Sequence, residues 1–513
     1  MDRARTAFVP PPMNLGQLLA DASRQAPALF HVNSLPSEAT RRLFEVTGVA
    51  QDHRLVEQGN LFVARRGAKF DAHTHLATAV AAGAVALVGE RPQAEVGALG
   101  APYVRVTDAR RALPYLAAAF YRHPSESMRV VGVTGTDGKT TTSYLTHWLL
   151  GGAHLAALSS TAGSYLGEHE LPPSEGHFTT PEATEVQALL ARFVAGGASH
   201  AVLESSSHGF ALHRLDAVKY AVGVFTNLAS EHMDFHLTKE AYAEAKATLM
   251  RRAPLAIINR DDPAFGYFAG AAAGAVITYG EHAEADVRLV RVEPVAGALD
   301  IELSVHGQSV HTHLPMVGLY NAHNAAAAVA VAEHEGVPLP RIVERLAAFP
   351  GVPGRMQLVA AQPTVIVDFA HTAPALAKAL AAVRRQQARL IVVVGSAGER
   401  DATKRAPLGR AAVEGADFAI FTEEDSRSED VSSILAEMAA GAAQAGAVEG
   451  ADFRIEPDRT EAIRQAVALA GSSDVVLLAG KGHERTLERA NETIQWDEAD
   501  VARRAVAWSG GTQ

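Results

Sequence analysis

Residues 131–142 read Val-Gly-Val-Thr-Gly-Thr-Asp-Gly-Lys-Thr-Thr-Thr, an apolar strand that runs through a glycine-rich turn into a helical pattern. In such a loop the backbone N–H groups and the helix N-terminus face an anion, a lysine adds positive charge and a hydroxyl can bind Mg²⁺. The pattern departs from a strict Walker A motif, because Val133 stands where that motif has its first glycine. An ordinary glycine-rich turn is the alternative, but the Gly-Lys-Thr-Thr-Thr ending at a helix start favours a phosphate-binding loop.

Short apolar runs alternate with alanine-rich stretches on both sides of this loop. Because the runs show no period-2 alternation, they suit strands that are buried on both faces of a sheet. Strands separated by helices indicate parallel sheets, so we predict an α/β fold. The clearest runs lie at residues 60–64, 84–88, 128–133, 220–227, 365–369, 390–395, 418–422 and 475–480.

Two seams divide the 513 residues. At about 150 residues per domain, the length predicts about three domains. One seam is the polar, Pro-containing stretch at residues 123–127, and the other is the Pro/Gly-rich stretch at residues 350–354. Stretches of this kind occur at turns and hinges between elements. We therefore predict domains at residues 1–125, 126–353 and 354–513.

The composition argues against several classes of protein. Lys and Arg number 46 against 57 Asp and Glu, a net charge of −11, which is unsuited to binding nucleic acid or an anionic membrane. The absence of cysteine excludes disulfides, thiolate nucleophiles, Cys-ligated zinc and iron–sulfur clusters. We find no targeting segment and no continuous apolar span, and so expect a soluble, cytoplasmic protein that does not insert into a membrane.

Further polar residues follow predicted strands. Glu204 ends an apolar run, and a carboxylate at the carboxyl end of a strand can reach a metal held by the phosphate loop. A capping cluster for the next helix is an equal alternative. His232, Asp234 and His236 have the spacing of metal ligands, but Mg²⁺ prefers oxygen, so these residues alone favour a structural role. Lys246 by itself is typical of a solvated helix lysine.

The last third of the chain has four polar clusters, each directly after a predicted strand. The carboxyl ends of parallel strands meet at one edge of a sheet, so the four clusters are expected to form one rim. Their mixture of acidic and basic groups suits a ligand that carries both an ammonium and a carboxylate. Each cluster alone is typical of a solvated loop, and their repeated placement carries the prediction. They lie at residues 368–372, 395–401, 424–430 and 480–484.

Taken in order, these motifs resemble the Mur ligase family, and within it the MurE-type ligases. The resemblance covers nearly the whole chain. It implies a small α/β UDP-binding domain at the N-terminus, a central P-loop-like ATPase with a parallel sheet and a C-terminal Rossmann-like domain. It rests on residues 52–54, 59–64, 135–141, 179–181, 204–209, 226–234, 245–246, 318–325, 354–356 and 480–484.

The resemblance implies a catalytic site at Lys139, Glu204, His232 and Lys246. Thr140 and Glu204 match ligands of a first Mg²⁺, and His232 matches a histidine near a second. Lys246 matches a lysine that reacts with CO₂ to form a carbamate, and the carbamate gives the second Mg²⁺ oxygen ligands. The implied contacts to ATP are Gly135, Thr136, Asp137, Gly138, Lys139, Thr140, Thr141, Asn321, Asn324, Arg355 and Asp368.

Two more groups of residues match binding positions of the family. The implied contacts to the UDP-linked substrate are Asp52, His53, Arg54, Thr179, Thr180, Ser207 and Arg214. The implied contacts to the amino acid are Arg405, Glu424, Asp425, Arg427, Gly480 and Glu484.

The activity implied is ATP-dependent amide-bond formation through an acyl phosphate, with release of ADP and phosphate. The implied partners are ATP, a diamino acid and UDP-N-acetylmuramoyl-L-alanyl-D-glutamate, as in the synthesis of peptidoglycan precursors, and we expect a monomer. One alternative is another Mur-type ligase or a folylpolyglutamate ligase. A second is a nucleotide-binding protein that has lost ligase activity, and the joint presence of Lys139, Glu204, His232 and Lys246 argues against it.

The sequence departs from the family pattern at four places. Asp137 replaces the usual Asn of the phosphate loop, His53 replaces Ser, and Leu212 stands where many members have Gln. Residues 424–427 read Glu-Asp-Ser-Arg in place of Asp-Asn-Pro-Arg, the motif associated with meso-diaminopimelate.

The fourth departure bears on the amino acid. An ionised Asp only accepts hydrogen bonds, so Asp425 disfavours the second carboxylate of meso-diaminopimelate. Glu424, Asp425 and Glu484 are predicted to form an acidic end for a side-chain ammonium, with Arg405 and Arg427 available for the α-carboxylate. We therefore predict L-lysine or L-ornithine. Meso-diaminopimelate, held through Arg427, is the alternative.

Overall fold

The computed structural model describes residues 8, 10–31, 37–67, 70–172, 179–229, 231–295 and 297–510. The chain divides into two compact units. The first unit comprises residues 1–287 with 327–342, and the second comprises residues 288–326 with 343–513.

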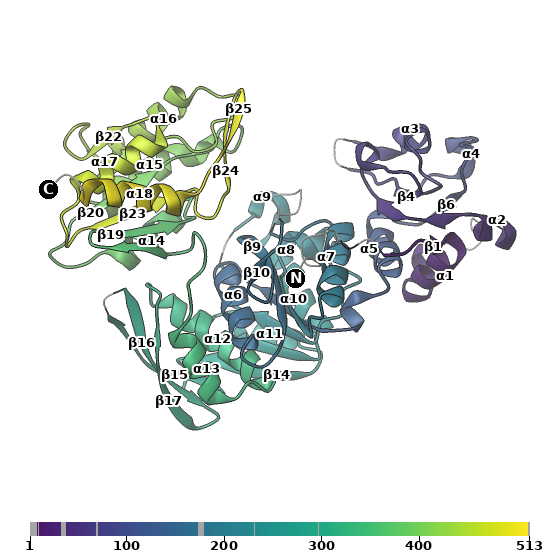
Figure 1. Cartoon of the computed structure of the whole chain (residues 1–513), viewed down its shortest axis with the longest axis horizontal. Coiled ribbons are helices and arrows are strands. Elements are labelled where there is room, and N and C mark those ends of the chain that lie inside the picture. Colours follow the sequence, from purple (N-terminus) through teal and green to yellow (C-terminus); the bar gives the residue numbers. More distant parts are fainter. Residues whose placement is uncertain are drawn as a thin grey trace. The chain divides into compact units, whose positions relative to one another are not determined.

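The N-terminal part of the first unit is built on a four-stranded parallel sheet (Figure 1). Its strands in order are β3 (Gly48–Ala50), β4 (Asn60–Val63), β5 (Ala86–Gly89) and β6 (Tyr103–Arg105). One face packs on α1 (Leu15–Gln25) and α5 (Ala109–Phe120), and the other on η4 (Ala72–His75) and α3 (Leu76–Ala81). The smaller elements are β1 (Met13–Asn14), η1 (Pro27–Leu29), α2 (Glu38–Leu43), β2 (Glu45–Val46), η3 (His53–Leu55), α4 (Gln93–Val96) and η5 (Pro124–Glu126).

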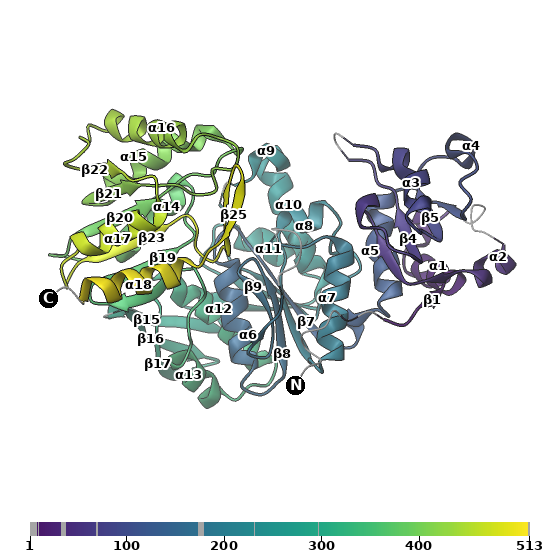
Figure 2. The ribbon, with the colours of Figure 1, turned by 45° about the horizontal axis from the view of Figure 1, so that its top comes forward.

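The larger sheet of the first unit carries the phosphate loop (Figure 2). Its parallel strands in order are β8 (Ala156–Ser160), β11 (His200–Glu204), β7 (Arg129–Thr134), β12 (Val222–Phe225), β13 (Leu255–Asn259) and β14 (Ala275–Gly280). Two antiparallel strands, β9 (Gly163–Leu166) and β10 (His169–Glu170), extend the β8 edge. The helices along this stretch and after it are α6 (Lys139–Leu150), α7 (Ala183–Ala195), α8 (Ser207–Ala211), α9 (Met233–His236), α10 (Lys239–Arg252), α11 (Phe265–Ala271), α12 (Tyr320–His334) and α13 (Leu339–Ala347).

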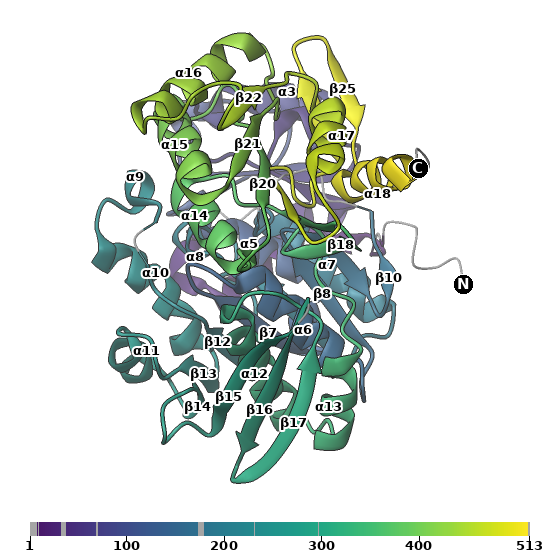
Figure 3. The ribbon, with the colours of Figure 1, turned by 90° about the vertical axis from the view of Figure 1, so that its left-hand side faces the viewer.

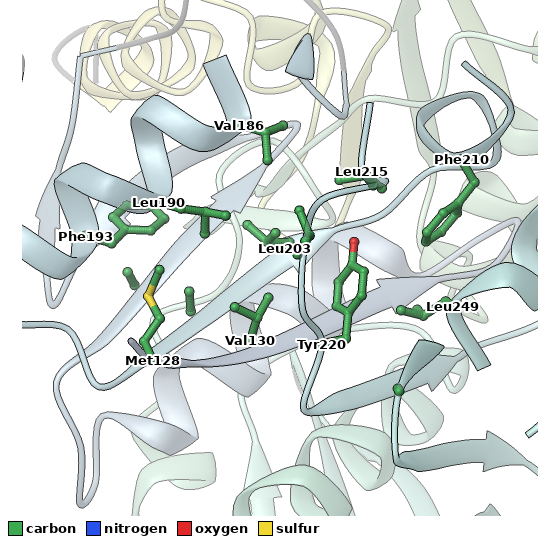
Figure 4. Packing of buried hydrophobic residues seen from close by; sticks show 14 of the residues in the cluster. Met128, Val130, Val186, Leu190, Phe193, Leu203, Phe210, Leu215, Tyr220 and Leu249 are labelled. Atoms are coloured by element: carbon green, nitrogen blue, oxygen red, sulfur yellow. The ribbon is translucent and has the colours of Figure 1, made fainter. Parts of the chain in front are cut away.

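The core of this sheet explains why its strands are apolar throughout. Val130 and Leu203 pack against Leu190 and Phe193 of α7, as Figure 4 shows. Residues 130–134 of β7 are all buried, which is the two-sided burial that the sequence predicts. Gly132 has a steric role, because a Cβ there would lie 2.7 Å from side-chain atoms of Leu249 and Tyr220.

A buried carboxylate ties the amino ends of these parallel strands. Glu335 accepts hydrogen bonds from Arg129, which begins β7, and its carboxylate lies 3.2 Å from Nε2 of His200, which begins β11. Burial acts to raise the pKa of Glu335, but the hydrogen bonds from His200 and Arg129 outweigh burial and lower the pKa to about 2. This tie lies at the opposite end of the strands from the phosphate loop.

The second unit contains a six-stranded sheet with helices on both faces (Figure 3). Its strands in order are β18 (Gln357–Ala361), β19 (Thr364–Asp368), β23 (Val475–Ala479), β20 (Leu390–Val394), β21 (Phe418–Phe421) and β22 (Phe453–Ile455), and only β18 is antiparallel. One face packs on α14 (Ala373–Val383), α15 (Arg405–Gly415) and α16 (Val431–Gln444), the other on α17 (Arg459–Leu469) and α18 (Glu498–Gly510). The remaining elements are β15 (Val287–Val295), the hairpin of β16 (Ala298–Val305) and β17 (Gln308–Leu314), η6 (Ala402–Lys404), and the hairpin of β24 (Thr486–Arg489) and β25 (Glu492–Gln495).

The predicted α/β class with parallel sheets is confirmed, and each of the eight apolar runs overlaps a strand. The three predicted domains each contain a sheet of their own, and their boundaries stay a prediction. Among the described residues, no helix is long and apolar enough to cross a membrane.

Candidate active site

The phosphate loop joins β7 to α6. Gly135 has φ +149° and Gly138 has φ +81°, so two of the loop's residues adopt backbone conformations that favour glycine. The Lys139 ammonium donates hydrogen bonds to the carbonyl oxygens of Thr136 (2.7 Å) and Gly135 (3.2 Å). Asp137 is exposed, so its carboxylate does not occupy the interior of the loop.

The loop is braced by the end of β12. Thr226 Oγ1 donates to the carbonyl oxygen of Asp137 (2.7 Å), and the Asp137 N–H donates to Asn227 Oδ1 (2.9 Å). A Cβ at Gly135 would lie 1.8 Å from Thr226 Oγ1, which is why this position requires glycine. The predicted motif Thr-Asn-Leu therefore fixes the shape of the loop.

Glu204 and Thr140 meet at the carboxyl ends of the strands. The hydroxyl of Thr140 donates to both carboxylate oxygens of Glu204, at 3.0 and 3.1 Å, and both side chains are buried. Thr161, in the turn between β8 and β9, donates to Glu204 Oε2 through its backbone N–H (2.9 Å) and its hydroxyl (3.1 Å). An oxygen pair of this kind fits Mg²⁺, which completes its shell with phosphate oxygens and water. Thr161 was missed by the sequence reasoning, because it lies in no recognised motif.

Lys246 is buried, with 1% of its surface exposed, and so is not a solvated helix lysine. Its ammonium donates to the carbonyl oxygen of Gly135 and lies 4.2 Å from the ring centroid of Tyr242. Burial, and after it the charge of Lys139, holds the pKa of Lys246 well below its usual value. A lowered pKa increases the fraction of neutral amine, which is the nucleophilic form of a lysine.

The rings of three histidines, His208, His232 and His236, form a cluster. The His208 ring lies 4.7 Å from that of His232 and 5.4 Å from that of His236. His232 has φ +57° and a side chain that is 46% exposed. Burial first, and then the charges of His232 and His236, lower the pKa of His208 to about 4. Within the described part of the chain, no three His, Asp or Glu side chains are arranged to hold a metal.

The predicted UDP-substrate residues of the larger sheet share a network around Thr180. Thr180 Oγ1 donates to the carbonyl oxygen of Glu204 (2.9 Å), and Arg214 donates to the carbonyl oxygen of Thr180 (2.9 Å). Ser207 Oγ lies 3.0 Å from Nε2 of His236. Thr179 begins this described stretch and is half-buried.

Two residues of this network were not predicted. Glu182, at the N-cap of α7, accepts hydrogen bonds from Arg214 (2.6 Å) and from Arg65 (3.1 Å). Arg65 follows β4, so Glu182 joins the N-terminal sheet to the residues around Thr180. Single charged residues outside motifs give no sequence signal for such a bridge.

Asp52, His53 and Arg54 form a turn of the N-terminal part. Asp52 accepts from the backbone N–H of Arg54 (2.9 Å) and binds its guanidinium at 2.6 Å. The hydrogen bond from Arg54 lowers the pKa of Asp52 to about 2. The His53 ring stacks on His75, with centroids 4.0 Å apart.

The remaining predicted ATP residues lie in the second unit. Asn321 and Asn324 are buried, and Asn324 Nδ2 donates to Asn321 Oδ1 (2.9 Å). Asp368 accepts from the backbone N–H groups of Met356 (2.8 Å) and Ala370 (2.9 Å). The Arg355 guanidinium stacks on Phe369, 4.5 Å from the ring centroid. Arg355 and Asp368 therefore share one loop region at the end of β19.

The predicted acidic end of the amino-acid site contains an internal cation. Lys481, which is fully buried, binds Asp425 Oδ1 at 2.7 Å and Glu484 Oε2 at 2.6 Å. Asp425 Oδ1 also accepts from the backbone N–H of Glu488 (2.9 Å), whereas Oδ2 lies 3.9 Å from Arg427 Nη2. Two clusters of the predicted rim, at residues 424–430 and 480–484, thus meet, with one ammonium already among the carboxylates.

Glu424 is a buried acid in the same rim. Its Oε2 atom has no hydrogen-bond partner among the described residues. Burial raises the pKa of Glu424, while Lys404, Arg459 and Lys481 act to lower it. Gly480 (φ +105°) faces it, since a Cβ there would lie 2.8 Å from Oε2.

The two predicted arginines are engaged with protein groups. Arg405 binds Glu429 at 2.8 Å and Glu437 at 3.3 Å. Arg427 donates to Glu488 (2.9 Å) and to the carbonyl oxygen of Gly398 (2.6 Å). Arg405 Nε has no hydrogen-bond partner among the described residues, and the binding of the α-carboxylate by the two arginines stays a prediction.

Comparisons with known proteins match this architecture along most of the chain. Family models match in three places: residues 45–121 (Mur ligase family, catalytic domain), 133–332 (Mur ligase middle domain) and 354–482 (Mur ligase, glutamate ligase domain). A UDP-N-acetylmuramyl-tripeptide synthetase of Deinococcus radiodurans is 48% identical over 469 residues, which cover 90% of this chain and 95% of that protein. The chain belongs to the Mur ligase family.

Two further members of the Mur ligase family carry a more specific name. A UDP-N-acetylmuramoyl-L-alanyl-D-glutamate–2,6-diaminopimelate ligase of Geobacillus thermodenitrificans is 38% identical over 475 residues, 90% of this chain and 95% of that protein. A solved structure of a ligase with this name superposes with a TM-score of 0.67 and 29% identity, and covers 96% of this chain and 99% of that one. The predicted family and the predicted ATP-dependent ligase class are confirmed.

Proposed function

We propose that this Mur ligase joins L-lysine or L-ornithine to UDP-N-acetylmuramoyl-L-alanyl-D-glutamate, with cleavage of ATP to ADP and phosphate. The relatives named as tripeptide synthetase and as diaminopimelate ligase support the UDP-linked substrate. The observation that carries the choice of amino acid is the carboxylate of the buried residue Asp425, whose Oδ2 accepts no hydrogen bond from the described residues and lies 3.9 Å from Arg427 Nη2.

The reaction proceeds in two steps. A carboxylate oxygen of the UDP-linked peptide attacks the γ-phosphorus of ATP, the bond to the β-phosphate oxygen breaks, and ADP leaves. The neutral amine then attacks the acyl carbon, the amide bond forms, inorganic phosphate leaves and the amine loses a proton. Phosphoryl transfer depends chiefly on positioning and charge stabilisation, so Lys139 and the amino end of α6 are the groups expected to hold the phosphates.

Thr140 and Glu204 are the residues proposed to bind Mg²⁺. Bound there, Mg²⁺ would neutralise phosphate charge during transfer. Thr161 would hold the Glu204 carboxylate in one orientation through its two hydrogen bonds. Lys246 would be carbamylated, which its burial and lowered pKa favour, because CO₂ reacts only with the neutral amine.

The UDP-linked substrate is proposed to contact Thr179, Thr180, Ser207 and Arg214. The hydrogen bond from Thr180 to the backbone of Glu204 connects that contact region with the proposed metal ligand. Glu182 would orient Arg214 by the 2.6 Å hydrogen bond between them.

The side-chain ammonium of the amino acid is proposed to bind Asp425 Oδ2 and Glu424 Oε2. Glu424 Oε2 is buried and has no hydrogen-bond donor within the part of the chain that the structure describes. Asp425 Oδ2 belongs to a buried residue, and the charged group recorded beside it is Arg427, at 3.9 Å. Two carboxylates, those of Asp425 and Glu484, contact the ammonium of Lys481, and the Glu424 carboxyl group lies in the same rim. An added ammonium would meet these carboxyl groups. A second carboxylate on the ligand would add further negative charge there.

Meso-diaminopimelate is the second candidate. It is favoured by Arg427, whose Nη2 atom lies 3.9 Å from Asp425 Oδ2 and so near the far end of the proposed pocket. The name of the Geobacillus relative also points to it.

The test is phosphate release by the purified chain with ATP, UDP-N-acetylmuramoyl-L-alanyl-D-glutamate and each of the three amino acids. We expect kcat/KM for L-lysine or L-ornithine to exceed that for meso-diaminopimelate by about tenfold or more, the ratio that one uncompensated charge contact provides. A preference for meso-diaminopimelate would refute the proposed amino acid. If none of the three amino acids supports phosphate release, the proposed ligase reaction is refuted.

A further inference from the structure

Lys481 is a buried cation whose two ion-pair partners both belong to the proposed amino-acid site. Its side chain is 0% exposed and lies 2.7 Å from Asp425 Oδ1 and 2.6 Å from Glu484 Oε2. An ammonium is removed from water only where charge and hydrogen bonds compensate its lost hydration. Asp425 and Glu484 supply that compensation.

The backbone around Lys481 is shaped to turn this side chain inward. Gly480 and Gly482 have φ +105° and +50°, so a residue on each side of the lysine adopts a left-handed conformation. At Gly482 a Cβ would lie 2.7 Å from Phe369 Cβ and 2.9 Å from the carbonyl oxygen of Gly354. A larger residue there would displace the turn, so the position of Lys481 is fixed by its neighbours in the chain.

The two carboxylate oxygens of Asp425 have different partners. Oδ1 accepts from Lys481 and from the backbone N–H of Glu488 at 2.9 Å, and both donors hold it in place. Oδ2 accepts no hydrogen bond from the described residues and lies 3.9 Å from Arg427 Nη2. The same ammonium lies 2.6 Å from Glu484 Oε2; burial raises the pKa of Glu484, and the charge of Lys481 opposes that shift.

We propose that Lys481 is a positioning and specificity-determining residue for the diamino acid, acting as the internal counter-ion that orients Asp425 and Glu484 toward the ligand's side-chain ammonium. The inference rests on the proposed function and deepens it. Residues 425 and 481 are expected to be energetically coupled in their effect on the binding of the diamino acid. With an Asn at position 425, the charge of Lys481 would be matched by Glu484 alone, and the site would become one unit more positive.

Lys481 is distinct from the structural ion pair of the same unit. Arg459 and Glu498 are both fully buried, and Arg459 also donates to the carbonyl oxygens of Glu423 and Ala479 near two strand ends. Among the described residues, the Lys481 ammonium contacts side-chain carboxylates and no strand backbone. Loss of Lys481 is therefore expected to affect the binding of one substrate more than it affects folding.

The experiment is a double-mutant cycle with Asp425→Asn, Lys481→Met and the double variant, with KM measured separately for the diamino acid, for ATP and for the UDP-linked substrate. We expect Lys481→Met to raise KM for the preferred diamino acid about tenfold or more and to leave the other two KM values within about twofold. When Asp425→Asn is already present, Lys481→Met should raise KM for the diamino acid by a factor about ten times smaller. This difference corresponds to a coupling free energy of about 1.4 kcal/mol between the two positions.

Controls separate this role from a structural one. Asp425→Asn preserves the shape of the side chain. If Lys481→Met does not fold, Lys481→Arg replaces it in the cycle, and its KM for the diamino acid should lie closer to the wild-type value. Lys219→Met removes an exposed lysine elsewhere and should change none of the three KM values. Equal changes in all three KM values, or additive effects at 425 and 481, would overturn the proposal.

Failure of the proposed function gives a different result. If the wild-type chain prefers meso-diaminopimelate, the proposed amino acid is wrong, while the same cycle measured with meso-diaminopimelate still tests Lys481. If the wild-type chain is active and Lys481→Met leaves every KM unchanged, only the role of Lys481 is refuted. If the wild type releases no phosphate with any diamino acid, the proposed function fails and the inference about Lys481 fails with it.

Discussion

Replacing Glu498 by Gln is expected to destabilise the second unit strongly. Arg459 Nη2 and Nε donate to the Glu498 carboxylate at 2.6 and 3.0 Å, and both side chains are 0% exposed. At an effective dielectric constant of 20 the attraction at 2.6 Å is about 6 kcal/mol before desolvation is subtracted. Removal of one partner leaves a buried, uncompensated charge, so the free energy of unfolding should fall by about 3–5 kcal/mol.

The loss should also reach the amino-acid site. Arg459 donates to the carbonyl oxygens of Glu423 (3.1 Å) and Ala479 (2.9 Å), the residues directly before Glu424 and Gly480. If the guanidinium shifts, the ends of β21 and β23 lose a shared anchor. We expect KM for the amino acid to rise even at temperatures where the variant stays folded.

The assay is denaturant unfolding of the full chain, followed by tryptophan fluorescence. One of the three tryptophans is Trp496, whose indole N–H donates to Glu498 Oε2 at 2.7 Å. Glu461→Gln is the matched control, since Glu461 forms an exposed pair with Arg464 on α17, and it should lower the free energy of unfolding far less than Glu498→Gln does. A double variant, Arg459→Met with Glu498→Leu, should recover part of the stability. A loss below about 1 kcal/mol in Glu498→Gln, or a double variant no more stable than the single one, would refute this reasoning.

Four shorter predictions concern the other sites. Glu204→Ala should abolish turnover while the UDP-linked substrate still binds, as measured by titration calorimetry. Lys246→Ala should be nearly inactive and regain activity with added acetate, which replaces the carbamate oxygens; full activity without acetate would exclude a role. Thr161→Val should weaken Mg²⁺ activation by about 10–100-fold, measured as the Mg²⁺ concentration for half-maximal rate. The lowered pKa of Glu335 provides stability that is present above its unfolded pKa and lost as pH falls toward about 2, so Glu335→Gln should flatten the decline in unfolding midpoint between about pH 4.5 and 2.

The fold was predictable because its signals are local. A run such as residues 390–394 is apolar without alternation, and only a strand buried on both faces suits that pattern. The glycines in residues 135–138 also indicated a turn in the sequence. In the structure, positive φ values and a close approach by Thr226 require glycine there. The two-unit division was less visible, since residues 288–326 group with the second unit without any seam in the sequence.

The site was predictable as a set of motifs and not as a set of contacts. Glu204 and Thr140 were named separately, and their hydrogen bonds depend on two strands being neighbours in one sheet. Lys246 alone indicated a solvated helix position, and burial against Gly135 contradicts that interpretation. Thr161 and Glu182 stand outside motifs, so only the folded chain assigns them partners.

Charge arithmetic from sequence failed most clearly at the amino-acid site. Counting Glu424, Asp425 and Glu484 as one acidic end ignores Lys481, although Lys481 lies only three residues before Glu484. The structure places its ammonium between two of the three carboxylates, so the excess negative charge is one unit smaller than the motif suggests. Under the proposed function, the charge at position 425 is the difference from the family pattern that we expect to favour an ammonium over a second carboxylate on the ligand.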